Sequence, residues 1–395
     1  MCERALDFVD ECYANEDLSL LSKLTLVIPT YNRNYYLSRC LWYHAHFPFG
    51  QIIVADSSPE EKKVVNKETV EKIRSLFHAN ILYLEYKPET EEYGGDIYRK
   101  WADAVQHVEK EYSQIIADRE FVIPTTIVSS ISFLQKHLDY AMSDANYLML
   151  NKYDNTNYYF NYWRKNQKSL SHDTPIERLE HANDVQAFPL MATHRSNGHK
   201  EVYSSFLEHG CRTIAFGEVY LELIDMISGK YNHDKSMIHI IRDISFVETK
   251  NGIKKSESSY SRYSVAKECP SDVIHSEIQC LENGIKTKLS SSNKNSDYSD
   301  RYSMQVYQFL VEYIDKRYYN SNFSVAHPFL SNIWRHLSKK QKYYILKIIP
   351  LQRANNAAVY QKRCPEINTI LEIVVKTVKY YSHDKSVLDY FLKIQ

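Results

Sequence analysis

The sequence predicts an α/β fold in which helices flank a mainly parallel sheet. Between residues 24 and 137, short apolar runs of strand length alternate with stretches of helical spacing, the pattern that builds parallel sheets. The runs are short and mostly apolar, which is typical of strands buried on both faces. Ligands of such sheets bind at the carboxyl ends of the strands, so the residues after each run are candidates for a functional site.

Each element is assigned from its length and spacing. In chain order, we expect a strand at 24–28, a helix at 34–46, strands at 51–55 and 81–86, a helix at 97–108, a strand at 114–117, a helix at 197–209, a strand at 212–216, a helix at 218–229 and a strand at 237–241. The stretch 138–190 is less regular and rich in aromatic residues.

The chain divides into four predicted segments. We expect an N-terminal extension at 1–21, the α/β domain at 22–248, a polar linker or irregular segment at 249–300 and a helical C-terminal domain at 301–395. The serine-rich and asparagine-rich run at 290–296 is the strongest loop signal of the third segment. Apolar residues at helical spacing support the fourth.

The composition is that of an ordinary globular protein. Forty-nine basic and 49 acidic residues argue against nucleic acid as a partner. Seven scattered cysteines indicate neither a disulfide framework nor a zinc site and fit a reducing cytoplasm. The acidic N-terminus does not resemble an export signal, and no run is long enough to cross a bilayer. Nine glycines form neither the dinucleotide-binding fingerprint nor a P-loop.

Two strand ends carry candidate donor-binding residues. The first strand runs into Val27-Ile28-Pro29-Thr30-Tyr31-Asn32-Arg33, and the second into Ala55-Asp56-Ser57-Ser58. Pro29 ends the strand and stiffens the turn, so that Tyr31 and Arg33 leave the sheet where a nucleotide can stack and be hydrogen-bonded. Asp56 is placed to accept hydrogen bonds from a ribose or base. Alternatively, Asp56 and Ser57 cap the helix that begins near Pro59.

The next two strand ends carry phosphate and metal candidates. Lys100 lies at the edge of an apolar helical stripe, so its ammonium either points back toward the strand ends or is solvated. Gly94 and Gly95 precede it and allow close approach of a ligand. In Asp118-Arg119-Glu120, carboxylates at i and i+2 are suited to Mg²⁺ or Mn²⁺ bridging a diphosphate. Arg119 either turns outward or supplies positive charge that weakens the metal requirement.

Taken in this order, the motifs resemble those of GT-A glycosyltransferases of family-2 type, over about residues 22–245. The closest similarity is to a bacterial subgroup with A-D-S-S after the second strand and F-x-x-P after the metal motif, here Phe121 to Pro124. The subgroup usually has three consecutive acids where Arg119 interrupts the run. The resemblance implies a GT-A fold, Rossmann-like with a mainly parallel sheet flanked by helices, here with a C-terminal helical region. It also implies that Lys100 contacts the donor phosphate.

The resemblance further implies an inverting, metal-assisted transfer of a sugar from a nucleoside-diphosphate donor to a glycan or lipid-linked acceptor. Synthesis of surface polysaccharide, capsule or lipopolysaccharide is the implied setting. Glu218 is the candidate base that deprotonates the acceptor hydroxyl, although a glutamate near a helix start is also favoured by the helix dipole. His194 and Arg195 are candidate acceptor or phosphate contacts, and Arg242 is a weaker phosphate candidate.

Two alternatives stay open. A catalytically silent sugar-nucleotide or glycan-binding module is the second functional hypothesis, with Arg119 in the acidic motif as its best support. The segment 331–363 holds eight basic residues and no acid. It is either a solvated face or a peripheral contact with anionic lipid at the inner face of the cytoplasmic membrane.

Overall fold

The structure is a computed structural model of the chain. It describes residues 13, 16–88, 96–152, 158–163, 167–185, 189–243, 246–249, 252–255, 271–292 and 370. The predictions made for Gly94 and Gly95, for nearly all of the N-terminal extension before residue 16, for nearly all of the helical C-terminal domain and for the basic segment 331–363 lie outside the described residues.

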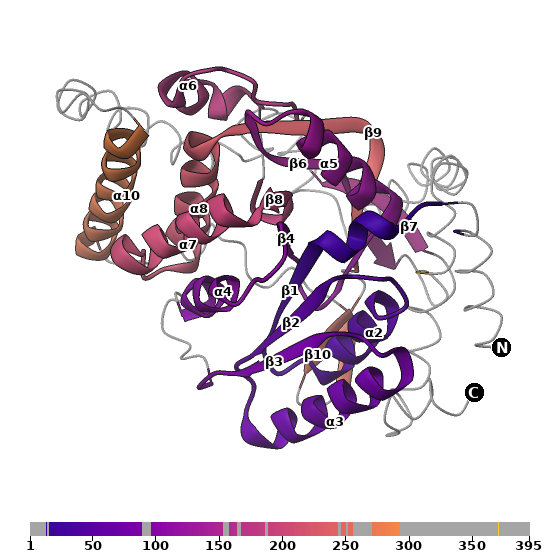
Figure 1. Cartoon of the computed structure of the whole chain (residues 1–395). Helices are drawn as coiled ribbons and strands as arrows, with labels where there is room; N and C mark the ends of the chain where they lie inside the picture. The colour runs from indigo at the N-terminus through magenta and orange to yellow at the C-terminus, as the bar shows by residue number, and fades with distance from the viewer. Residues whose placement is uncertain are drawn as a thin grey trace, which may run out of the picture.

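A mixed sheet lies at the centre of the described part (Figure 1), in the order β3-β2-β1-β4-β8-β6-β9-β5, with β7 paired to β6. β1 (Leu24–Thr30), β2 (Gln51–Asp56), β3 (Ile81–Glu85) and β4 (Tyr112–Ile115) run parallel. Every residue of β1 and β2 is buried, as expected of strands between two layers of helices. The predicted α/β class is confirmed.

The remaining strands extend this sheet or form a separate hairpin. They are β5 (Glu120–Val122), β6 (Tyr140–Lys152), β7 (Tyr158–Trp163), β8 (Thr193–Arg195), β9 (Lys230–Asp243), β10 (Phe246–Thr249) and β11 (Gly252–Lys255). Register shifts between β6 and β9 fall between Tyr140 and Met142 and again from Ala145 to Tyr147, and such irregularities bend a strand. At its end, β9 pairs with β5 through Glu120 and Arg242, which brings β9 to the turn after β4.

Helices cover the sheet on both faces. They are η1 (Ser19–Lys23), α2 (Asn34–His44), α3 (Glu60–Phe77), α4 (Asp96–Gln106), α5 (Pro124–Lys136), α6 (Pro175–Val185), η2 (Pro189–Met191), α7 (Ser196–His209), α8 (Ile214–Ser228) and α10 (Ser271–Ser292). Among them, no helix is both long and apolar enough to cross a membrane.

Two local predictions were wrong. The expected strand at 212–216 is the start of α8, where the Thr213 hydroxyl accepts a hydrogen bond from the amide of Phe216 (3.3 Å) and so caps the helix. Three apolar residues fit strand and helix spacing equally well, and the cap decides between them. In addition, β1 continues through Pro29 to Thr30. Pro29 is tolerated there because the pairing of β1 with β4 ends at Val27.

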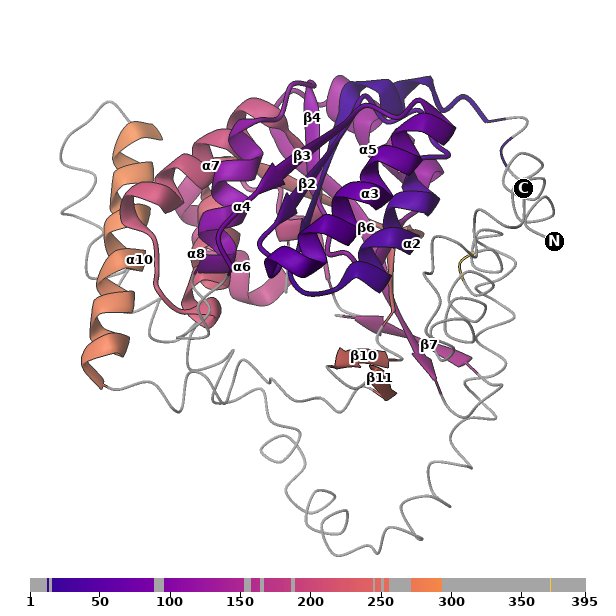
Figure 2. The ribbon, with the colours of Figure 1, turned by 90° about the horizontal axis from the view of Figure 1, so that it is seen from below.

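Residues 271–292, predicted as part of the polar linker, instead form α10, which packs outside α7 and α8 (Figures 1 and 2). The Glu277 carboxylate accepts hydrogen bonds from the amides of Arg212 (2.8 Å) and Thr213 (3.3 Å), a favourable place for negative charge at the start of α8. Leu281, Ile285 and Leu289 are buried. The linker prediction failed here because this i, i+4, i+8 stripe lies among polar residues.

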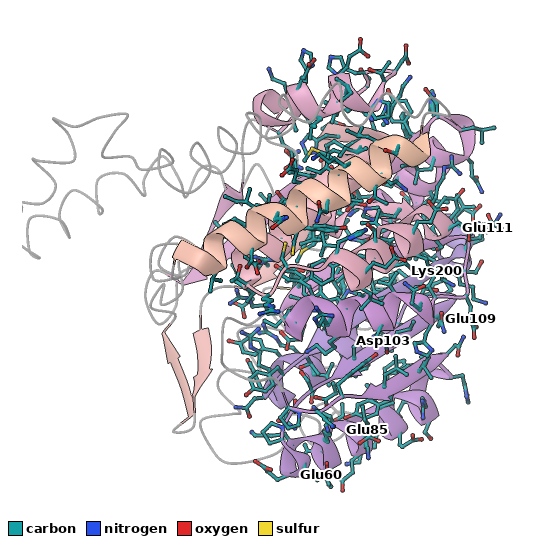
Figure 3. All side chains as sticks on the ribbon, turned by 90° about the vertical axis from the view of Figure 1, so that its left-hand side faces the viewer. Glu60, Glu85, Asp103, Glu109, Glu111 and Lys200 are labelled. Atoms are coloured by element: carbon teal, nitrogen blue, oxygen red, sulfur yellow. The ribbon has the colours of Figure 1, made fainter. Side chains whose placement is uncertain are left out.

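Acidic side chains lie along the side of the molecule that carries α3, β3 and α4. Figure 3 shows this side and labels the exposed carboxylates Glu60, Glu85, Asp103, Glu109 and Glu111 together with Lys200, which lies near Glu109 and Glu111. Some are paired, since Lys67 approaches Glu85 at 2.8 Å and Lys23 approaches Glu111 at 3.2 Å.

Three buried histidines make the fold sensitive to acid. His44 donates from Nδ1 to the Cys40 carbonyl (2.7 Å) and accepts at Nε2 from the Val122 amide (3.3 Å), the pattern of a neutral ring. Burial lowers the pKa of His44 to about 3 and that of His239 to about 4. Burial also lowers the pKa of His199 well below its ordinary value.

We expect the melting temperature to fall as the pH drops from 7 toward 4. An unfolded histidine takes up its proton near pH 6.5, so below that pH the unfolded state binds more protons than the folded one. The stabilisation is complete above pH 6.5 and is lost as the pH falls toward the folded pKa values. Each histidine contributes up to about 1.4 kcal/mol per pH unit to the slope of the free energy of unfolding against pH. Calorimetric melting curves recorded between pH 7 and pH 4 measure the melting temperature and this slope.

His44→Gln removes one titrating group and should flatten the slope, even though it lowers stability at pH 7. The matched control is His78→Asn, because His78 is exposed and has a positive φ of 51° that asparagine tolerates. An unchanged slope in the His44 variant would contradict this origin of the acid sensitivity.

Candidate active site

The carboxyl ends of β1 and β2 and the turn after β4 are joined by buried hydrogen bonds. The Thr30 hydroxyl donates to Asp118 Oδ2 (2.8 Å). Lys100 Nζ, on α4, donates to the Thr30 carbonyl (3.1 Å) and to Ser57 Oγ (2.6 Å). Lys100 is only 6% exposed, so its ammonium points toward the strand ends as predicted, and the solvated alternative is wrong.

Asp56 organises the loop after β2. Its carboxylate is fully buried and accepts hydrogen bonds from the Ser58 amide (2.7 Å), Asn66 Nδ2 (2.7 Å) and the Tyr83 hydroxyl (2.5 Å). Burial and this last hydrogen bond raise the pKa of Tyr83. The helix that follows has Pro59 at its N-cap with no side-chain hydrogen bond, so Asp56 does not cap it directly. A ribose or base would share a carboxylate that already has three donors.

The turn after β1 directs Arg33 toward Asp118. Asn32 has a positive φ of 54°, a conformation that asparagine adopts more readily than most residues. The backbone amide of Asn32 donates a hydrogen bond to Ser58 Oγ (2.8 Å). The chain therefore turns sharply after Tyr31, and Arg33 Nη1 lies 3.3 Å from Asp118 Oδ1. Asn32 is a positioning residue that the sequence reading missed, although it stands in the first motif.

The two carboxylates of the predicted metal motif are each paired with an arginine. Arg33 contacts Asp118, and Arg242 from the end of β9 contacts Glu120 through Nε and Nη2. The other Glu120 oxygen accepts from the Ala117 amide (2.7 Å). The side chains of Asp118 and Glu120 are 2% and 0% exposed, against 44% for Arg33 and 16% for Arg242. The guanidinium groups are therefore the more accessible members of both pairs.

Arg119 lies between these two ion pairs. Its carbonyl accepts a hydrogen bond from the Asp243 amide (3.0 Å), which ties the turn to the end of β9. Burial, together with the positive charges of Arg242 and Arg33, lowers the pKa of Arg119 to about 10. The guanidinium groups of Arg33, Arg119 and Arg242 therefore repel one another at this turn.

Asp118 and Glu120 do not fit a divalent cation in this arrangement. Mg²⁺ and Mn²⁺ require converging oxygen ligands, whereas these carboxylates are buried and bound to different arginines. Within the described ranges, no group of three or more His, Cys, Asp or Glu residues is arranged to hold a metal ion. The i, i+2 spacing is present, but the predicted metal site does not form from it.

Glu218 lies in the second turn of α8 rather than at the helix start, which weakens the helix-dipole explanation for it. It is 1% exposed, and the Tyr98 hydroxyl lies 3.5 Å from its Oε2. A Cβ at Gly217 would come within 2.6 Å of the Tyr98 ring, so glycine permits this approach of α4. Because Tyr98 and Lys100 share one helix, α4 connects Glu218 to the strand ends.

Glu222 and Asp225 are two further buried acids on α8 that the sequence reading missed. They follow Glu218 at i+4 and i+7, so the three carboxylates lie on one side of the helix. The sequence signal that could have found them is the spacing of acidic residues at helical intervals within an otherwise apolar helix.

The structure gives Arg195 and His194 partners within the fold, and their ligand contacts stay predictions. β8 runs antiparallel to β4, so Arg195 pairs with Tyr112 at the start of β4, the edge opposite Asp118. Arg195 donates to the carbonyls of Tyr140 (2.9 Å), His137 (3.2 Å) and Leu134. His194 is buried against Asp225, with 3.4 Å between Nε2 and Oδ1. These residues stabilise the fold, whereas Arg242 reaches the Asp118 turn.

No protein-family model and no curated protein matches the chain. Among solved structures, it is similar to TarS from S. aureus, with 14% identity, a TM-score of 0.40, 68% of this chain covered and only 44% of that chain. TarS 1-349 in complex with UDP gives 12% identity, a TM-score of 0.43, and 94% and 92% coverage. Mannosyltransferase PcManGT from Pyrobaculum calidifontis, in complex with GDP-Man and Mn2+, gives 10% identity, a TM-score of 0.38, and 92% and 88% coverage.

Proposed function

We propose that this chain is a glycosyltransferase that moves a sugar from a nucleoside-diphosphate donor to a hydroxyl group of a glycan or lipid-linked acceptor. The observation that carries this proposal is the joining of the β1, β2 and β4 strand ends through Thr30, Lys100 and Asp118. Ligands of parallel α/β sheets bind at this edge. The order of the sequence motifs, which resembles that of family-2-type glycosyltransferases, supports the same assignment.

In this proposal the donor lies across the strand ends. Tyr31, directly after the end of β1, stacks on the base, and Asp56 contacts the ribose or base through the loop that it organises. Arg33, Lys100 and Arg242 act on the phosphates, and Asp118 holds Arg33 in place. Charge-assisted hydrogen bonds of this kind are the strong ones in anion recognition.

The proposed transfer inverts the configuration at the anomeric carbon of the donor sugar. The acceptor oxygen attacks that carbon from the face opposite the diphosphate, and the bond from the carbon to the diphosphate oxygen breaks. The nucleoside diphosphate leaves with the electron pair, and Glu218 takes the proton of the acceptor hydroxyl. To reach Glu218, the acceptor exchanges with the Tyr98 hydroxyl, whose 3.5 Å contact is at the long limit of a hydrogen bond.

A donor-hydrolysis assay with a panel of UDP- and GDP-sugars tests this function. We expect release of UDP or GDP, and we expect Lys100→Met to reduce it about 10- to 100-fold, because the variant loses charge-assisted hydrogen bonds near the diphosphate. Lys136→Met is the matched control, since Lys136 is exposed at the end of α5. Melting curves of both variants monitor folding. No turnover with any donor, with or without Mn²⁺, would contradict the enzyme assignment.

The burial of Glu218, which is 1% exposed, favours a silent sugar-nucleotide or glycan-binding module as the second candidate. Binding without hydrolysis or transfer would support that module over the enzyme. The setting in surface polysaccharide synthesis, and a contact of segment 331–363 with anionic lipid, belong to the proposal on the strength of the resemblance and of charge alone.

A further inference from the structure

The turn between β4 and β5 presents arginines where the related sequence pattern presents acids. The carboxylates of Asp118 and Glu120 are almost completely buried, and their partners Arg33 and Arg242 are the more accessible members of the two pairs. In the sequence, Arg119 lies between Asp118 and Glu120, and its side chain is partly buried. A ligand that approaches this turn therefore meets positive charge first.

We propose that Arg119, with Arg33 and Arg242, supplies the positive charge that holds the donor's diphosphate, so that this chain binds a nucleoside diphosphate without a divalent cation. The inference rests on the proposed function and specifies how its donor site works. It replaces the predicted metal at Asp118 and Glu120 by guanidinium groups of the chain itself.

The charge balance at the turn supports an anionic ligand. Three guanidinium groups and two carboxylates interact there, which leaves one positive charge in excess. Within the described part of the chain, the Arg119 guanidinium has no hydrogen bond or ion pair. Like charges held together in a partly buried place repel one another strongly. An anion relieves this repulsion, and the planar fork of arginine matches phosphate oxygens.

The same geometry disfavours a cation. To ligate Glu120, a metal ion would displace Arg242 from a carboxylate that is 0% exposed, and breaking a buried pair leaves an uncompensated charge. To ligate Asp118, it would displace both Arg33 and the Thr30 hydroxyl. In either position it would also be repelled by the neighbouring guanidinium groups.

The turn is held in position before any ligand arrives. The Arg119 carbonyl is bound to the Asp243 amide (3.0 Å), and the Asp243 carboxylate forms a fully buried ion pair with Arg39 at 2.6 Å. Glu120 is bound to the amide of Ala117 across the base of the turn (2.7 Å). A site with so little freedom loses little entropy when the diphosphate binds.

The test is titration calorimetry of the full chain with UDP and with GDP, in EDTA and in Mn²⁺. We expect the tighter of the two nucleotides to bind equally well, within about twofold, in both buffers. Arg119→Gln should weaken that binding about tenfold or more in EDTA, because a charge-assisted contact to phosphate is lost. Arg119→Lys keeps the charge but loses the planar guanidinium fork, so its affinity for the nucleotide should lie between those of the wild type and Arg119→Gln.

Arg99→Gln is the matched control, with the same change of charge on an exposed arginine of α4, and it should bind as the wild type does. Binding that requires Mn²⁺, or an Arg119→Gln variant that folds and binds normally, overturns the inference and leaves the proposed function standing. Failure of both nucleotides to bind in both buffers overturns the inference and the proposed donor class together. Melting curves show whether each variant is folded.

Discussion

Replacing Glu218 with Gln is expected to lower the rate of sugar transfer by about 10²- to 10⁴-fold, the range that a positioned general base contributes. An amide cannot accept the proton of the acceptor hydroxyl, although it matches the carboxylate in size. The proposed nucleotide site lies at the strand ends, so the dissociation constant for UDP or GDP should stay within about twofold of wild type. Steady-state kinetics and calorimetry on the same preparation measure both quantities.

Glu222→Gln is the matched control because Glu222 is also a buried carboxylate on α8, one turn further along the helix. It should retain most of the transfer activity. Near-normal turnover of the Glu218 variant would remove Glu218 from the mechanism. An equal loss in both variants, with lowered melting temperatures, would assign these carboxylates to the stability of α8.

Replacing Arg39 with Met is expected to lower the free energy of unfolding by about 3–5 kcal/mol, the usual cost of removing one partner from a buried ion pair. Arg39 and Asp243 are both 0% exposed and lie 2.6 Å apart. The Arg39 guanidinium also lies over the rings of Tyr35, Tyr36 and Phe121, at 5.1, 4.6 and 5.4 Å from their centroids. The variant removes the guanidinium that faces the buried Asp243 carboxylate. Urea denaturation followed by circular dichroism measures the change.

Two comparisons sharpen this result. Arg39→Met combined with Asp243→Asn should be less destabilised than Arg39→Met alone, because no buried charge then lacks a partner. Lys23→Met removes the exposed pair with Glu111, whose side chains are 39% and 61% exposed, and should cost less than about 1 kcal/mol. A single Arg39 variant as stable as the Lys23 variant would refute the importance of the buried pair.

Local signals predicted most of the sheet. The mostly apolar runs at 24–28 and 51–55 became β1 and β2, because a strand covered on both faces needs no polar alternation. The stretch at 34–46 became α2. These properties depend on neighbours within a few residues or on a regular period. The apolar stripe of α4 left two directions open for Lys100, and the hydrogen bonds to Thr30 and Ser57 in the folded chain decide between them.

Strand direction was not predictable in the same way. Arg195 follows a short apolar segment just as Arg33 does, yet β8 runs antiparallel to β4 and carries Arg195 to the other edge of the sheet. Similarly, Leu281 and Ile285 lie in a segment polar enough to be read as a linker, and the face of α8 that they cover became visible only in the folded chain. Such features depend on the partner that a segment meets and not on its own spacing.

The sequence by itself determined the α/β class, the identity of the strand ends that meet, and the placement of Asp118, Arg119 and Glu120 after the fourth buried strand. Only the tertiary structure decided what those three residues face. The partners of the two carboxylates come from 85 residues before Asp118 and 122 residues after Glu120, and they are arginines. Charge interactions act through space and strengthen with burial, so whether this acidic motif suits a cation or surrounds an anion depends on the arginines that the fold brings to it.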